Sequence, residues 1–345
     1  MNIQDLLKLE RIKLSSGQLR KILLLKIILL QPQFLLLDNA HLGLDHQSRQ
    51  VLNDYIDLLV SQDNQQIIMS GHFRSLPKCI THVLHLEKGQ INGIQSVGEY
   101  MANKQAINAA PELPVSIPNY FSRPVNEPFK RVLHFADISI KYKNTSVLEK
   151  LNWTVKKGEK WTLQGPNGVG KSTLISLIYA DHPQAYSNKI QLFDKARGSG
   201  ESIWDIKKRI GFSSPELHSF FNFNFETLSV ILSGLYDTFY LGKYSDEQRQ
   251  AAESLLQYFD ISEHLYAPFH NLSTGTQRVI LLLRALIKRP PVLLLDEPYQ
   301  GLDQDTIHQC NHLLCEILTE QHTLIFISHF DDEVPAIIKK QLILN

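Results

Sequence analysis

Apolar residues in this chain fall into two patterns that predict strands. In Val132–Tyr142 apolar and polar residues alternate, which is the period of a strand with one buried face. Val292–Asp296 and Thr323–Ser328 are short, almost wholly apolar runs, as in strands that are buried on both faces. Two further strands are expected at Leu151–Val155 and Trp161–Gln164.

Helical segments separate these strands. One helix is expected directly after Gly170, a mostly helical stretch from about Asp205 to Lys288, and another helix over Asp303–Thr319. Apolar strands that alternate with helices are typical of a parallel α/β sheet. We therefore expect an α/β fold with a parallel sheet at its core.

Four short motifs occur twice, in the same order and at matched spacing, which indicates an internal duplication. Leu14–Gln18 (LSSGQ) resembles Leu272–Thr276 (LSTGT), and the apolar run Phe34–Asp38 resembles Val292–Asp296. The distance from the leucine to the aspartate is 24 residues in both copies. The remaining pairs are Gly43-Leu44-Asp45 with Gly301-Leu302-Asp303, and Ser70-Gly71-His72 with Ser328-His329.

The two copies differ in length, and this difference predicts the domain organisation. Only 13 residues precede the first motif of the first copy, whereas the second copy has well over a hundred residues before its own. We expect a C-terminal remnant of the repeat unit at 1–95, a linker at 96–131 and a complete unit at 132–345. The linker contains five spaced prolines, which fix φ and remove hydrogen-bond donors, so an extended connector is expected.

The amino-acid composition limits the classes of protein to which this chain can belong. Lys+Arg and Asp+Glu both number 35, so the formal charge is zero and nucleic-acid binding could rest only on a local basic groove. Three cysteines make no disulfide framework, which indicates a reducing compartment. Lys26 and Gln31–Gln33 interrupt the most apolar stretch, and the N-terminus has no apolar signal-peptide core. We expect a cytoplasmic protein, with peripheral membrane attachment only through a partner.

The clearest chemical motif is a phosphate-binding loop between the strand at Trp161–Gln164 and the helix that follows Gly170. The sequence GPNGVGKS matches G-x-x-x-x-G-K-[ST] in full. Its glycines let backbone N–H groups turn toward a phosphate, the lysine reaches the β- and γ-phosphates, and the serine hydroxyl is a Mg²⁺ ligand. The predicted ATP-binding residues here are Gly165, Pro166, Asn167, Gly168, Val169, Gly170, Lys171, Ser172 and Thr173.

Two acids end the apolar strand Val292–Asp296. Asp296 is a candidate to hold Mg²⁺ through a water molecule, together with Ser172. Glu297 stands where it could polarise an attacking water. By itself this segment could be an ordinary strand that ends in a turn, but behind a phosphate-binding loop the catalytic interpretation is favoured.

The duplicated LSSGQ and LSTGT motifs each place a serine and a glycine just before an expected helix. Serine at such a position is a common N-cap. Alternatively, its hydroxyl and the exposed N–H groups could grip a γ-phosphate from outside. The matched occurrence favours the second interpretation and makes Ser15, Gly17, Ser273 and Gly275 candidate ATP contacts.

With these motifs the chain resembles the ATP-binding cassette (ABC) ATPases. Five motifs follow one another in the family's order: the phosphate-binding loop, the LSTGT signature, the acidic strand Val292–Asp296, Gly301-Leu302-Asp303 and His329. The resemblance implies an ABC cassette fold, with antiparallel and helical subdomains around the parallel sheet, and Mg·ATP hydrolysis. It implies Glu297 and His329 as catalytic residues and Tyr142 as the aromatic residue on adenine. Within the family, the segments Asp181–Asn188 and Gly198–Lys208 are similar to tandem soluble cassettes of the ModF/PhrA type.

The family pairs the phosphate-binding loop of one cassette with the signature of another, and this scheme predicts one complete site. A second site would lack the loop, and it would have Asn39 in place of the catalytic glutamate. The complete site could be closed by Ser15 of the remnant in cis, or by Ser273 of a second chain in trans. We favour the homodimer, because an incomplete domain is a poor docking partner.

The biological role is less constrained. The resemblance implies an ATPase that energises or regulates transport of molybdate or a similar oxyanion, with a membrane permease as partner. The alternative is a soluble ATP-driven switch that acts on a protein or nucleic-acid complex. Two observations point toward this alternative: Ser214-Pro215-Glu216 replaces the family's glutamine that links ATP to a transporter, and the sequence shows no membrane span. The similarity to the ModF/PhrA type points toward transport. The aromatic run Phe220–Phe225 could be a docking patch, but core filling is favoured.

Overall fold

The computed structural model divides into two compact units, residues 1–109 and 110–345, each of which is described separately. It describes residues 22–23, 25–27, 29–30, 32–41, 44, 46–63, 66–70, 76–87, 89–103, 111–122, 127–143, 145–221, 224–238 and 242–344.

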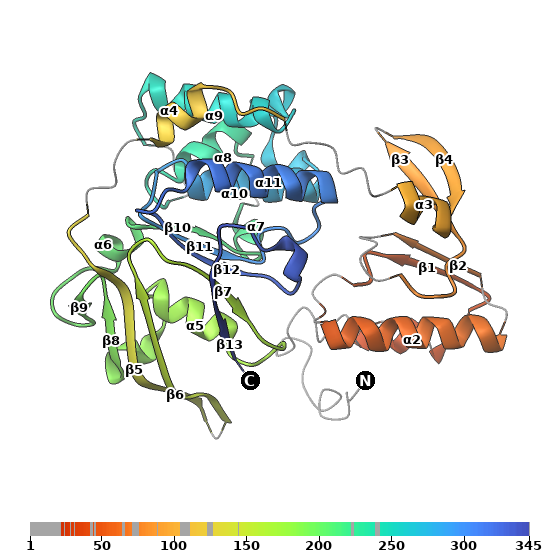
Figure 1. Ribbon diagram of the computed structural model, residues 1–345, viewed down its shortest axis with the longest axis horizontal. Helices are drawn as coiled ribbons and strands as arrows, with labels where there is room; N and C mark the ends of the chain where they lie inside the picture. The colour runs from red at the N-terminus through yellow and green to blue at the C-terminus, as the bar shows by residue number, and fades with distance from the viewer. Residues whose placement is uncertain are drawn as a thin grey trace. The chain divides into compact units, whose positions relative to one another are not determined.

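A five-stranded parallel sheet forms the centre of the second unit, with strand order β10-β11-β12-β7-β13 (Figure 1). The middle strands β11 and β12 are buried on both faces, apart from the partly exposed Asp296 at the end of β11, which explains their continuous apolar sequences. The expected parallel α/β core is confirmed. The strands are β7 (Lys160–Gln164), β10 (Ile210–Ser213), β11 (Val292–Asp296), β12 (Thr323–Ile327) and β13 (Lys340–Ile343).

The parallel arrangement brings the sequence motifs to one edge of this sheet. The phosphate-binding loop follows β7, Glu297 follows β11, and His329 lies two residues beyond β12. Because β11 pairs with β12 and β12 pairs with β7 in parallel, the carboxyl ends of all three strands meet at the same edge.

An antiparallel sheet of four strands, in the order β6-β5-β8-β9, belongs to the same unit. β5 is the alternating segment expected from the sequence, and it buries one face in a core that also contains the helix after the phosphate-binding loop. The strands are β5 (Arg131–Tyr142), β6 (Thr145–Lys156), β8 (Lys189–Leu192) and β9 (Lys195–Ala196).

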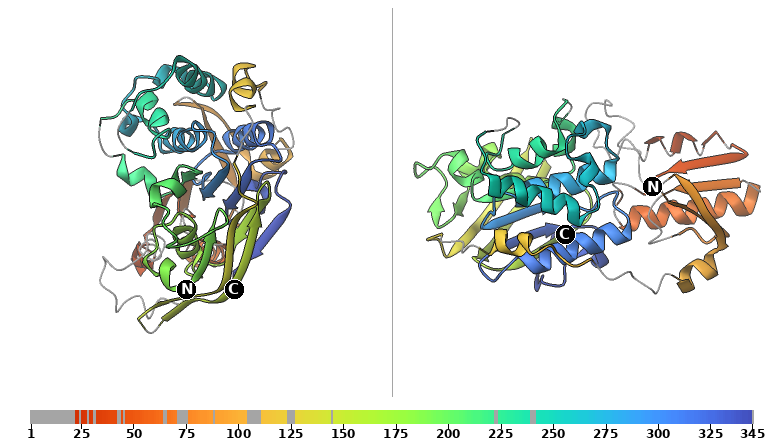
Figure 2. Two further views of the ribbon diagram at one scale, coloured as in Figure 1. Left: turned by 90° about the vertical axis from the view of Figure 1, so that its left-hand side faces the viewer. Right: turned by 90° about the horizontal axis from the view of Figure 1, so that it is seen from above.

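The helices of the second unit pack on the two faces of the parallel sheet. α8, α10 and α11 lie on one face, and α5 lies on the other with the antiparallel sheet (Figures 1 and 2). The α-helices after the loop are α5 (Lys171–Ile178), α6 (Ile203–Lys207), α7 (Leu217–Phe220), α8 (Thr227–Ser233), α9 (Asp246–Tyr258), α10 (Thr274–Leu286) and α11 (Gln304–Ile317). Short 3₁₀ helices are η3 (Pro183–Ser187), η4 (Ser262–His264), η5 (Phe269–Asn271) and η6 (Asp331–Glu333).

The expected extended connector at 96–131 is wrong in part, because this range contains two helices, α3 (Val97–Asn103) and α4 (Ser116–Phe121). α4 packs beside α9 (Figure 2) and buries Ile117, Tyr120 and Phe121. These three residues follow the i, i+3, i+4 spacing of one helical face. Pro118 is tolerated because it lies in the first turn, where its missing N–H costs no helical hydrogen bond.

The first unit is much smaller. Strands β1 (Phe34–Asp38) and β2 (Gln66–Ser70) form a two-stranded parallel sheet, and β3 (His82–Glu87) and β4 (Gln90–Ser96) form an antiparallel pair. One face of β1 and β2 packs against α2 (His46–Asp63) to make a small core. Its buried members are Leu35, Leu37, Ala40, Leu44, Leu52 and Ile56.

Candidate functional site

The phosphate-binding loop joins β7 to α5, and its glycines adopt backbone conformations that a side chain would obstruct. Gly165 has φ of 150°, and a Cβ there would lie 2.6 Å from the carbonyl oxygen of Leu344. Gly170 has φ of 105°, and a Cβ there would lie 2.9 Å from Cγ1 of Val147. The loop therefore requires glycine at both positions, and it turns directly into the N-terminus of α5.

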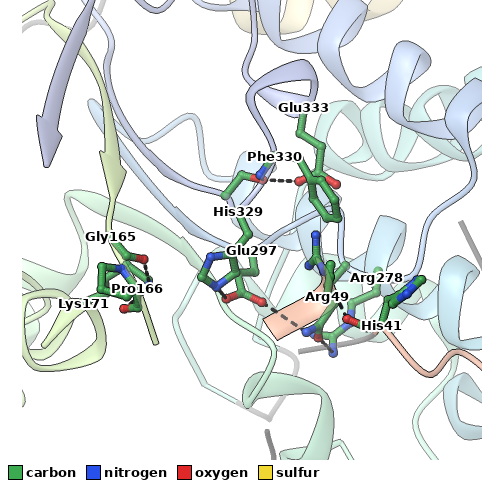
Figure 3. A network of polar contacts seen from close by, with 12 residues as sticks. His41, Arg49, Gly165, Pro166, Lys171, Arg278, Glu297, His329, Phe330 and Glu333 are labelled. Atoms are coloured by element: carbon green, nitrogen blue, oxygen red, sulfur yellow. Dashed lines mark hydrogen bonds and ion pairs between the residues drawn. The ribbon is translucent and has the colours of Figure 1, made fainter. Parts of the chain in front are cut away.

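Lys171 is the first residue of α5 and is buried. Its Nζ donates hydrogen bonds to the carbonyl oxygens of Gly165 at 2.7 Å and Pro166 at 3.0 Å (Figure 3). The ammonium is thus held inside the curve of the loop, where the sequence motif places the β- and γ-phosphates of a nucleotide. Ser172 and Thr173 follow it in the first turn of the helix.

Asp296 ends β11 and carries the most perturbed carboxyl group of this edge. Its pKa is raised to about 7, chiefly by burial and then by the neighbouring carboxylates of Glu297 and Glu216. The ammonium of Lys171 acts in the opposite direction. A carboxyl group beside two other acids favours the binding of an additional cation, and carboxylate and hydroxyl oxygens are the ligands that Mg²⁺ prefers. The residues present therefore fit a Mg²⁺ ion.

Glu297 faces His329, as Figure 3 shows, with Oε1 lying 2.9 Å from Nε2 of the imidazole. Its second oxygen accepts a hydrogen bond from the amide of Gln300 at 3.1 Å, and the Gln300 oxygen accepts one from Arg278 at 3.3 Å. Glu297 also has a left-handed backbone with φ of 43°, which is a strained conformation for a glutamate. Both carboxylate oxygens therefore have a partner that orients the group.

The segment after β10, where the family's glutamine was expected, is built differently. The backbone oxygen of Ser214 accepts a hydrogen bond from Arg278, 3.4 Å long. Glu216 lies near enough to Asp296 to raise its pKa. This position therefore supplies a carboxylate to the edge where an amide was expected.

The signature serine of the second copy is the N-cap of α10. Ser273 Oγ accepts a hydrogen bond from the backbone N–H of Thr276 at 3.1 Å, and it lies 2.8 Å from the Thr276 hydroxyl. Both Ser273 and the helix start are exposed, so the capping role and contact with a phosphate are compatible. Gly275 lies in the first turn. Ser15 and Gly17 of the first copy lie outside the described residues.

Tyr142 is the last residue of β5, and half of its surface is exposed. Its hydroxyl lies 2.7 Å from Nε2 of His182, which belongs to the segment before η3. Burial lowers the pKa of His182, so the ring is neutral over the physiological range. Tyr142 therefore presents an aromatic surface that is anchored at its hydroxyl end.

The corresponding edge of the first unit has a different set of side chains. Asn39 follows β1 and donates a hydrogen bond to Asp38 at 3.3 Å, and Asp38 accepts another from the hydroxyl of Ser70. Gly71 and His72 lie outside the described residues. No carboxylate occupies the position after Asp38, as the sequence predicts.

Sequence reasoning missed Arg278, Gln300 and the contribution of Glu216. Gln300 lies three residues after Glu297, and this short spacing is a signal that its amide could contact the carboxylate. Arg278 stands on α10 and gave no motif signal, because it approaches Glu297 only through the fold. Of the aromatic run, Phe221 is buried and Phe225 packs against the core, whereas Phe220 is exposed and Phe223 lies outside the described residues.

Known proteins match most of the chain. The sequence model of the ABC transporter family matches residues 148–300. The chain is 37% identical over 344 residues to the ABC transporter ATP-binding protein ModF of Escherichia coli, covering 95% of this chain and 69% of that protein. It is 32% identical over 345 residues to an uncharacterized ABC transporter ATP-binding protein of Schizosaccharomyces pombe, covering 98% of this chain and 69% of that protein.

Solved structures match the fold of part of the chain. The cassette cbiO1 of Clostridium perfringens, part of the ABC transporter complex cbiONQ, aligns with a TM-score of 0.51 and 26% identity, over 63% of this chain and 85% of that one. The cassette MJ0796, solved as a post-hydrolysis dimer with ADP and phosphate, aligns with a TM-score of 0.52 and 23% identity, over 62% of this chain and 94% of that one. Among the described residues, no helix is long and apolar enough to cross a membrane.

Proposed function

The chain belongs to the ABC transporter ATP-binding proteins, which are nucleotide-binding ATPases, and we propose that its hydrolytic centre is the carboxyl edge of the parallel sheet in the second unit. The observation that supports this most directly is the Glu297–His329 pair next to Asp296, whose pKa is raised to about 7. In this proposal 132–345 is the working cassette, and 1–95 carries motifs that repeat the C-terminal part of that cassette.

Each residue has a distinct task in this centre. The loop N–H groups and Lys171 hold the β- and γ-phosphates, Ser172 and Asp296 hold Mg²⁺, and Tyr142 stacks on adenine. Mg²⁺ when bound supplies positive charge to the β- and γ-phosphate oxygens. Glu297 accepts a hydrogen bond from the attacking water. The oxygen of this water forms a bond to the γ-phosphorus, while the bond between the γ-phosphorus and the β–γ bridging oxygen breaks.

The partners of Glu297 support its role as the group that activates water. Gln300 donates to one carboxylate oxygen, and the imidazole of His329 lies 2.9 Å from the other, so contacts on both sides restrict the side chain. A general base that is held in place loses little conformational freedom in the transition state. Ser273 would close the site from a second chain, as the dimeric arrangement of the family requires.

The test of this centre is a matched pair of substitutions at equivalent positions of the two units. Glu297→Gln keeps the shape of the side chain and removes its negative charge, and turnover should fall by roughly 10²–10⁴-fold, the range of general-base effects, while ATP still binds. Asn39→Glu should add no turnover, because residues 1–109 contain no G-x-x-x-x-G-K-[ST] sequence. Phosphate release measured under single-turnover conditions checks both, and a gain of turnover in Asn39→Glu would show that the site is assigned to the wrong edge.

For the biological role we propose coupling of this ATPase to transport of a small oxyanion, on the strength of the similarity to ModF. The partner would be a membrane permease, and the chain would work in the cytoplasm at the inner face of the membrane. Purification from membranes with a crosslinker should recover a permease. Recovery of a soluble protein or nucleic-acid complex instead would favour an ATP-driven switch, in keeping with Pro215 and Glu216 where a transporter-coupling glutamine was expected.

A further inference from the structure

Two sequence segments that resemble one subgroup of the family, Asp181–Asn188 and Gly198–Lys208, have no task in the hydrolytic centre just described. The first contains η3 and lies beside β5, the strand that ends at Tyr142. We propose that these two segments form a bracket that positions Tyr142 for the base of the nucleotide, with His182 as the residue that holds its ring. This inference rests on the proposed function, in which Tyr142 stacks on adenine.

The first observation is that β5 is paired with β8 along only part of its length. β8 pairs with β5 only from Leu133 to Ala136, so the last part of β5 has no strand on that side. The side chains of Asn188 and Gln184 take the place of the missing strand. Asn188 Oδ1 accepts from the backbone N–H of Ser139 at 2.9 Å. Gln184 accepts from the N–H of Lys141 at 3.3 Å and donates to the carbonyl of Lys141 at 2.8 Å.

The second observation is the orientation of His182. Its Nδ1 accepts a hydrogen bond from the backbone N–H of Gln184 at 3.2 Å, which caps η3. A neutral imidazole carries one proton, so that proton must lie on Nε2. Nε2 therefore donates to the hydroxyl oxygen of Tyr142 across the 2.7 Å contact. The hydrogen bond that caps η3 thus determines the tautomer of His182, and this tautomer places a donor against the hydroxyl of Tyr142.

The third observation is that the second segment holds the first. Lys207 forms an ion pair with Asp181 at 2.7 Å. Arg197, the residue just before the second segment, donates to the hydroxyl of Tyr186 at 3.1 Å and lies 5.1 Å from its ring centroid. Arg197 is itself held in a buried ion pair with Glu201 at 3.1 Å. The two segments are thus one connected structure that ends at Tyr142.

His182→Asn is the informative substitution. Asparagine is a good N-cap and can still accept the N–H of Gln184, but its shorter side chain cannot reach the hydroxyl of Tyr142. Loss of one neutral hydrogen bond should weaken ATP binding roughly threefold to tenfold. Tripolyphosphate, which has no base, should bind as it does to the unmodified chain. Tyr142→Phe should weaken ATP binding by a similar factor, and His182→Asn should then have no further effect.

The measurements are calorimetric titration with ATP and displacement of ATP by tripolyphosphate, on the full chain, with thermal unfolding of each variant as the check on folding. An unchanged ATP affinity in His182→Asn would overturn the bracket. So would a loss of tripolyphosphate affinity as large as the loss of ATP affinity. A further loss of ATP affinity when His182→Asn is added to Tyr142→Phe, as large as in the unmodified chain, would also overturn it. Lys171→Ala tests the proposed function separately, because it should weaken both ligands. ATP binding that survives Lys171→Ala would overturn the nucleotide site itself.

Discussion

The ends of β1 in the first unit and β11 in the second unit share one backbone geometry. Asn39 and Glu297, the residues that follow the two strands, have φ of 47° and 43°. Each donates its backbone N–H to the last residue of the neighbouring strand, Asn39 to Ser70 at 3.0 Å and Glu297 to Ile327 at 2.9 Å. The same turn therefore occurs with a glutamate and with an asparagine, so the left-handed backbone follows from the path of the chain and does not by itself indicate catalysis.

The two strand pairs differ in what covers them. Phe34, Leu36 and Ile68 in the first unit are 51%, 66% and 55% exposed. The equivalent residues of the second unit, Val292, Leu294 and Ile325, are fully buried in the core cluster that contains α5. The helix that carries Lys171 thus has two roles. It supplies the proposed phosphate-binding residue, and it covers the face of the sheet whose edge holds Asp296 and Glu297, the acids of the proposed centre.

The largest expected effect is on stability. Leu294→Asp places a charge in a closed core and should destabilise the second unit by more than about 4 kcal/mol, whereas Leu36→Asp changes an exposed position and should cost less than about 1 kcal/mol. All three tryptophans, Trp153, Trp161 and Trp204, lie in the second unit, so their fluorescence during urea unfolding reports on it alone. Hydrogen exchange of β1 and β2 reports on the first unit. Equal destabilisation by Leu36→Asp would mean that this face is covered in solution.

The next effect concerns the dependence of stability on pH. The folded pKa of Asp296 is about 7, above its usual value near 4, so the stability that protonation contributes is present below about pH 4 and is lost as pH rises through 7. Asp296→Asn removes this dependence. Without nucleotide, its stability relative to the unmodified chain should increase by about 2–3 kcal/mol between pH 5 and pH 8.

The matched control in the first unit is Asp38→Asn, since Asp38 is exposed. It should change stability by less than about 0.5 kcal/mol at both pH values. If the Asp296→Asn variant retained the full pH dependence of the unmodified chain, the carboxyl group would not be desolvated as the fold indicates.

A smaller effect distinguishes the two ways of closing the site. If two chains pair through their second units, turnover per chain rises with protein concentration, and Ser273→Arg lowers it by more than about tenfold, because a bulky cation replaces a hydroxyl at the interface. Ser15→Arg should then have little effect. Turnover that is independent of concentration and damaged only by Ser15→Arg would place the signature of the first copy at the site instead.

Local patterns were enough to predict the parts of the fold that depend on neighbouring residues. The apolar runs of β11 and β12, the glycine loop and the alternation of β5 each have a period or motif that is visible without the structure. α4 also had such a signal in the spacing of Ile117, Tyr120 and Phe121, but the prolines around it indicated an extended segment. Proline interrupts a helix only beyond its first turn, and Pro118 lies within the first turn of α4.

Other features depend on contacts between segments that are distant in sequence. Arg278 reaches Gln300, and Glu216 raises the pKa of Asp296, only because α10 and the end of β10 meet at the edge of the sheet. The left-handed backbone of Glu297 likewise follows from pairing with β12. The assignment of the site residues to phosphate, metal and base remains a prediction, although the structure places those of the second unit's loop and strand ends at one edge.

The central proposal is that the nucleotide site of this chain lies in the second unit, and the binding stoichiometry tests it most directly. Equilibrium dialysis with Mg·ATP at saturating nucleotide should give one ATP per chain for Glu297→Gln, which prevents turnover during the measurement. Adding Lys171→Ala should reduce that value to zero, because the site then lacks the cation that contacts the β- and γ-phosphates. Two nucleotides per chain, or one nucleotide that remains after Lys171→Ala, would contradict the account.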